Sequence, residues 1–101
     1  MSGFAARQLA VLEGRLSAYA EGSLSLNSLI SDIEGLANVI EDKVLSEHLS
    51  PLLFDLEEIN AYCIVYNDVP SPDGVEKINA SLAEIKQLFH DVLARAEGSR
   101  E

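Results

Sequence analysis

The sequence predicts an all-α protein, an antiparallel four-helix bundle, from three observations. Apolar residues recur at three- and four-residue steps in four separate windows. Serine, proline and glycine lie where these windows begin and end. No window alternates apolar and polar residues over the length of a strand, apart from 23–26, which is better interpreted as a helix cap. Four such helices with short connections bury their apolar faces most simply by packing up and down in one domain, 1–101.

The first helix is expected over residues 4–20. Its apolar stripe is formed by Leu9, Leu12, Leu16 and Tyr19. Gly22 follows the last of these residues and is suited to end the helix in a left-handed cap. Gly14 either weakens the middle of the helix or allows a neighbouring helix to approach closely.

The second helix is expected over 25–42, with Ser25 as its N-cap. Its apolar face is broad and comprises Leu26, Leu29, Ile30, Ile33, Leu36, Ala37 and Ile40. Asp32 and Glu34 lie on its other side. This helix therefore has one side for the core and one side with exposed carboxylates.

The third helix ends near residue 66, but its start is open between two alternatives. Ser46 could cap a short turn from residue 44, with Pro51 then causing a kink, or the helix begins afresh at residue 50 with Pro51 in its first turn. An apolar row is predicted to face the core, formed by Leu52, Leu53, Leu56, Ile59, Cys63 and Tyr66. Asp55, Glu58 and Tyr62 recur at the same spacing on another side.

The fourth helix is expected over 72–96, after a loop at 67–74 that is rich in proline, glycine and aspartate. Ser71 and Pro72 repeat the cap signal of Ser50 and Pro51. A narrow apolar seam follows, typical of a helix packed among helices, and comprises Val75, Ile78, Leu82, Ile85, Phe89 and Val92.

The charge of the chain is strongly acidic and unevenly distributed. The 101 residues carry a net charge of −10. Between Leu16 and Glu76 the only basic side chain is Lys43. Such a surface repels nucleic acid and anionic lipid and attracts a cationic protein. The alternative is that these acids only form a solvated surface that keeps a small protein in solution.

The sequence lacks the patterns that catalysis or metal binding usually needs. His48 and His90 have no glutamate three residues ahead of them, as a di-iron bundle would require. Cys63 is the only cysteine and lies in the apolar row, so it is expected to fill the core. We therefore expect no enzyme activity, no cofactor and no metal. No apolar run approaches the length of a membrane span, and the N-terminus does not resemble a secretion signal, which makes the cytoplasm the expected location.

Three segments together resemble a known class of proteins. They are SLISDIEGL at 28–36, LLFDLEEINAY at 52–62 and the helix around 75–93. This pattern is similar to that of small helical immunity proteins from bacterial polymorphic-toxin and contact-dependent inhibition systems. The resemblance implies an inhibitor that binds a cognate nuclease toxin, an RNase or a DNase, and blocks its active site.

We therefore expect an immunity protein whose second and third helices cover the basic cleft of a toxin. The expected contact residues are Asp32, Glu34, Asp55, Glu57, Glu58 and Tyr62. The alternative function is a regulatory adaptor or phosphotransfer-type module, for which His90 is the candidate histidine. Two further alternatives concern the third helix. Tyr62 and Tyr66 could merely close the edge of the core, and apolar residues left exposed there could close a homodimer.

Overall fold

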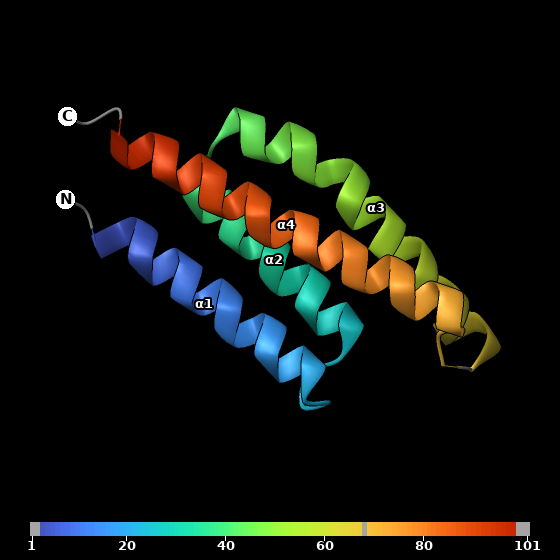
Figure 1. Ribbon diagram of the computed structural model, residues 1–101. Helices are drawn as coiled ribbons and strands as arrows, with labels where there is room; N and C mark the ends of the chain where they lie inside the picture. The colour runs from blue at the N-terminus through green and yellow to red at the C-terminus, as the bar shows by residue number, and fades with distance from the viewer. Residues whose placement is uncertain (1–2, 68, 99–101) are drawn as a thin grey trace.

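The computed structural model describes residues 3–67 and 69–98, and these residues form an all-α four-helix bundle. The helices are α1 (Gly3–Ala20), α2 (Leu26–Ile40), α3 (Lys43–Tyr66) and α4 (Pro72–Gly98). They form a ring in which α1 packs on α2 and α4, and α3 packs on the same two helices (Figure 1). Asp68, in the predicted loop, lies outside the described residues.

The caps of α1 and α2 confirm the turn chemistry predicted from the sequence. Gly22 has a φ of 84° and its amide donates to the carbonyl of Tyr19 at 3.1 Å. The next amide, that of Ser23, donates to Ala18 at 2.9 Å, which completes a Schellman motif. The Ser25 hydroxyl accepts from the Ser28 amide at 3.1 Å, as expected of an N-cap.

The start of α3 agrees within one residue with the first predicted alternative, which began the helix at residue 44, but the cap is a different residue. The helix begins at Lys43, because Asp42 is its N-cap and its carboxylate accepts from the Leu45 amide at 2.9 Å. Neither Ser46 nor Ser50 caps this helix. The Ser50 hydroxyl donates back to the Ser46 carbonyl at 3.1 Å, and α3 continues through Pro51.

The core lies along the middle of the ring and draws on all four helices. Its fully buried side chains include Leu12, Leu29, Ile33, Leu45, Leu56, Ile78, Ile85 and Phe89. Burial of this apolar surface is the main favourable term in folding. An added Cβ at Gly14 would meet nothing within 4 Å, so the alternative of close approach at this glycine is wrong.

The predicted apolar row of α3 is correct at its start and wrong at its end. Leu53 and Leu56 are buried, and Leu52 and Ile59 pack against the core. Cys63, however, is only half-buried, and Tyr66 is 65% exposed. The reason is that α3 and α4 have 24 and 27 residues, whereas α1 and α2 have 18 and 15. The hairpin formed by α3 and α4 therefore extends past the other two helices (Figure 1).

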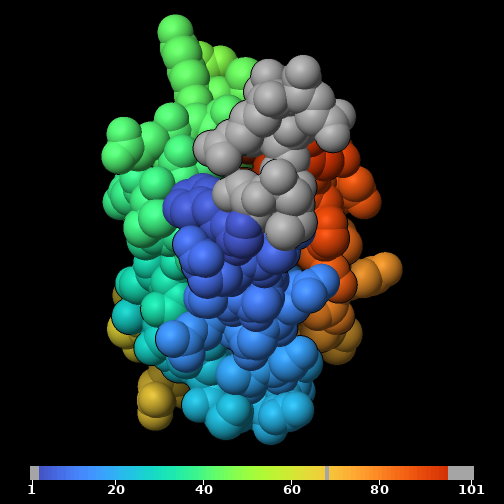
Figure 2. Space-filling model, turned by 90° about the vertical axis from the view of Figure 1, so that its left-hand side faces the viewer, coloured from blue at the N-terminus to red at the C-terminus, as the bar shows by residue number. Residues whose placement is uncertain are grey.

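Glu13 of α1 contacts two side chains of α4, one of them through an ion pair. A carboxylate oxygen of Glu13 lies 3.6 Å from the Lys86 ammonium and 3.7 Å from His90 Nε2. Figure 2 views the molecule from the left-hand side of Figure 1, and in this view α1 lies between α2 on one side and α4 on the other. The ion pair of Glu13 with Lys86 is about half exposed and contributes little to stability.

Candidate functional site

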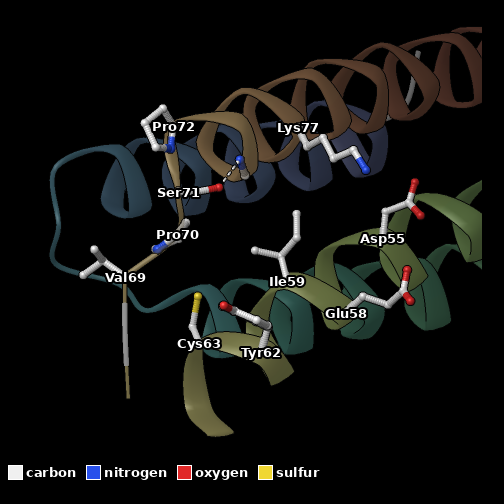
Figure 3. Close-up of a pocket in the computed structure, with 11 residues that line it drawn as sticks. Asp55, Glu58, Ile59, Tyr62, Cys63, Val69, Pro70, Ser71, Pro72 and Lys77 are labelled. Atoms are coloured by element: carbon white, nitrogen blue, oxygen red, sulfur yellow. Dashed lines mark hydrogen bonds between the residues drawn. The ribbon is translucent and has the colours of Figure 1, made fainter. Parts of the chain in front are cut away.

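A groove of about 620 Å³ lies between the last part of α3 and the first turn of α4. Its α3 wall is formed by Asp55, Glu58, Ile59, Tyr62 and Cys63, and its other wall by Val69–Pro72, Gly74 and Lys77. Figure 3 shows the two carboxylates at one end of this groove, with Lys77 reaching over from α4. We call it the α3–α4 groove. It is open to solvent and contains both apolar and charged groups.

The loop between the two helices builds this groove. Asn67 adopts a left-handed conformation, with φ of 48°, and its amide ends α3 by donating to the Ile64 carbonyl. Ser71 then starts α4, because its hydroxyl accepts from the Gly74 amide at 3.1 Å and Pro72 occupies the first helical position. The chain thus reverses direction within a few residues and sets the start of α4 beside α3.

The acidic groups of the groove are available to an outside partner. Asp55 and Glu58 are exposed, and among the described residues neither of them nor Lys77 takes part in an ion pair. Two carboxylates against one ammonium leave the groove with a net negative charge. Carboxylates that are not already paired can bind lysine or arginine side chains without first breaking an internal contact.

Tyr62 lines the groove next to Glu58, one helical turn further along α3, and it forms an aromatic pair with Tyr66, which lies outside the groove. The ring centroids of Tyr62 and Tyr66 are 4.6 Å apart and the rings are tilted by 42°. Tyr62 is 58% exposed, so it offers an apolar face and a hydroxyl to solvent. Tyrosine in such a position suits recognition, since it buries a large area on contact and can also bind a cation over its ring. The prediction that Asp55, Glu58 and Tyr62 share one side of α3 is confirmed by their joint place in this groove.

A second hollow of about 500 Å³ lies on the other flank of α3, facing α2. Glu34 of α2 and Glu57 of α3 line it, and Asp55 lines both hollows. Phe54, 58% exposed, adds an aromatic ring there. Five of the six predicted contact residues therefore lie in two adjoining hollows along α3.

Asp32 is the sixth predicted contact residue, and it lies apart from the other five. Its carboxylate is 3.5 Å from Nε of Arg15 on α1. Positions 32 and 34 are about 200° apart around a helix, so Asp32 points toward α1 while Glu34 points toward α3. The Asp32 carboxylate is therefore already paired with a side chain of this protein.

Lys77 and the loop from Val69 to Pro72 are site residues that the sequence analysis missed. A single lysine in the first turns of a helix carries no signal that it will face carboxylates about twenty residues earlier. The only available hint was the Ser71-Pro72 start signal, which predicts where α4 begins but not what it contacts.

The other ionisable groups do not form a second centre of comparable chemistry. His48 Nδ1 lies 2.9 Å from the carbonyl oxygen of Val44, to which the ring can donate. Burial, and then the charge of Cys63, raise the pKa of Tyr19 above its ordinary value of 10.0. Within residues 3–67 and 69–98 no three His, Cys, Asp or Glu side chains are grouped to hold a metal ion.

The fold and the groove together describe a small helical bundle with an acidic, aromatic-edged surface on α3. Comparisons with protein-family models, with curated proteins and with solved structures find no match to this chain. None of the helices in the described part of the chain has the length and apolar character needed to cross a membrane.

Proposed function

We propose that this protein is a non-enzymatic inhibitor that binds a basic protein through the two hollows along α3. The observation that carries the proposal is the α3–α4 groove, where unpaired Asp55 and Glu58 stand beside the exposed ring of Tyr62. Aromatic area with a rim of charge is the usual composition of a protein interface. The partner is expected to present lysine or arginine around an apolar or aromatic contact.

The proposed partner is the nuclease domain of a bacterial toxin, and the proposed setting is the cytoplasm. Nuclease domains are basic where they hold phosphates, so an acidic helical face complements them. The net charge of −10 would speed encounter with such a domain through long-range attraction. The resemblance of segments 28–36 and 52–62 to immunity proteins supports the same assignment.

A binding experiment tests this proposal. The probe is the nuclease domain encoded by the neighbouring gene, purified in a catalytically inactive form. We expect the double change Asp55→Lys with Glu58→Lys to slow association by roughly tenfold or more, as measured by biolayer interferometry at about 50 mM salt. The difference should shrink at about 500 mM salt, where the Debye length is only a few ångströms.

The matched control is a double variant with the same change in net charge at residues outside the two hollows. Glu47→Lys with Glu84→Lys changes the net charge by the same amount, but these residues line neither of the two hollows. The control should keep the association rate within about threefold of that of the unchanged protein. Equal slowing by both double variants would show that only overall charge matters. The absence of a toxin gene beside this one, or of binding to its product, would refute the inhibitor assignment.

A further inference from the structure

The α3–α4 groove has two chemically different ends. Asp55, Glu58 and Lys77 form the charged end (Figure 3). Cys63 lies at the apolar end, beside the loop that leads into α4. Ile59 lies between the two ends and packs against the core. A partner that fills the whole groove must therefore offer an apolar group and a charged group side by side.

The apolar end is open because Gly74 has no side chain. A Cβ added there would lie 3.4 Å from Oγ of Ser71, 3.5 Å from Cβ of Pro70 and 4.0 Å from Cγ2 of Ile59. These distances are ordinary van der Waals contacts, and they place the added atom between the loop and α3. A longer side chain at this position would therefore occupy part of the groove without displacing the backbone.

We propose that the α3–α4 groove binds one short segment of a basic partner protein, with an apolar side chain beside Gly74 and a single lysine or arginine at Asp55 and Glu58. The inference rests on the proposed function, because it names what the partner presents to the same groove. Burial of an apolar side chain beside Ile59 and Pro70 is favoured because it removes apolar surface from water. The groove volume of about 620 Å³ lies within the range of about 300–1,000 Å³ that is usual for sites of small ligands.

The charges of the groove favour one basic side chain. Asp55 and Glu58 carry two negative charges and Lys77 carries one positive charge, so the groove has a net charge of −1. Asp55 and Glu58 lie one helical turn apart, so a guanidinium group can donate to both carboxylates. Because that contact makes the groove neutral, a second basic residue of the segment gains no further unpaired carboxylate there.

The spacing of the two ends sets the shortest segment that reaches both. Asp55 and Ile59 are four residues apart in α3, which is about 6 Å along the helix axis. In an extended peptide, side chains two residues apart point the same way and lie about 6.5–7 Å from each other. The shortest matching segment is therefore an apolar residue, any second residue and a basic residue.

A titration of the isotope-labelled full chain with a capped tripeptide of leucine, alanine and arginine tests the proposal without any toxin. Amide signals of Ile59, Gly74 and Lys77 should shift and saturate in NMR spectra, with a dissociation constant of roughly 1–10 mM. Two comparison peptides, with alanine for leucine or glutamate for arginine, should each bind at least about fivefold more weakly. The absence of saturable shifts up to about 20 mM, or equal binding of either comparison peptide, would overturn the proposal.

A substitution at the apolar end tests the same assignment from the protein side. Gly74→Leu changes no charge and should raise the dissociation constant of the first tripeptide by about fivefold or more. Thermal melts should show a fold at least as stable, since leucine has a higher helix propensity than glycine. The control Gly14→Leu makes the same change in α1, where an added Cβ meets nothing within 4 Å, and should leave binding unchanged. Unchanged binding by Gly74→Leu, or an equal loss in the control, would contradict the proposal.

These results are separable from the test of the proposed function. If the nuclease domain binds as proposed but the tripeptide does not, only the present inference is overturned. If the tripeptide binds in the groove but no nuclease domain does, the inhibitor assignment fails and the preference of the groove for an apolar and a basic side chain stands.

Discussion

Two alanine substitutions in α3 test directly where the core ends. Leu56 is fully buried among residues of the central core, whereas Ile64, two turns further on, is 66% exposed. Leu56→Ala removes buried methyl groups and leaves a cavity, which should lower the free energy of unfolding by about 2–5 kcal/mol. Only about a third of the Ile64 side chain is buried, so Ile64→Ala should lose roughly 0.5–1 kcal/mol of burial free energy. The higher helix propensity of alanine offsets part of this loss, so the net change should stay within about 0.5 kcal/mol.

Urea unfolding followed by circular dichroism measures both values. A domain of this size has a total stability of about 5–15 kcal/mol, so Leu56→Ala should remove a large share of it. At about 4–8 °C per kcal/mol, its melting temperature should fall by about 10 °C or more, and that of Ile64→Ala by less than about 4 °C. A loss above about 2 kcal/mol for Ile64→Ala would show that the end of α3 is packed within the single chain.

Two further predictions concern backbone geometry and pH. Gly14→Ala should stabilise the protein by about 0.5–1 kcal/mol, because the site is helical and open. Gly22→Ala should destabilise it by about 1 kcal/mol, because φ is +84° there. Thermal melts would compare the two, and changes of the same sign would contradict the assigned cap. The raised pKa of Tyr19 means that the folded state holds this proton more tightly than the unfolded state. The contribution of Tyr19 to the free energy of unfolding is therefore fully present below about pH 10 and is lost as the pH rises above that value. Tyr19→Phe should flatten that loss in urea titrations between about pH 8 and pH 11, and an unchanged slope would contradict the assigned burial.

Local signals were enough to predict the helices and most of their caps. Ser25, Gly22 and Ser71 act through hydrogen bonds to residues within a few positions along the chain. Such contacts depend on sequence spacing alone. The same holds for the ridge of Asp55, Glu58 and Tyr62, because helical periodicity places them on one side wherever the helix packs.

The start of α3 was left open between two alternatives, and its cap was missed, because two local signals competed. Ser50 and Pro51 form a strong start signal, yet Asp42 provides an earlier one. Pro51 and Glu47 are exposed, so the carbonyl that loses its donor to the proline lies on the solvent side of the helix. Burial of Leu45 and Leu49 then favours a helix that continues through the proline.

The sequence by itself determined the four helices, the apolar seams of α1 and α2, most of the seams of α3 and α4, the acidic side of α3 and most of the turn chemistry, since these depend on neighbours close along the chain. The predicted seam of α4 is wrong at its first residue, because Val75 is 44% exposed. Tertiary structure alone decided how far the core reaches along α3, which leaves Tyr66 exposed where periodicity placed it inside. It also turned Asp32 toward Arg15 and set Lys77 opposite Asp55 and Glu58. The physical reason is that the relative lengths and packing of different helices determine which surfaces are covered, and periodicity within one helix contains no information about either.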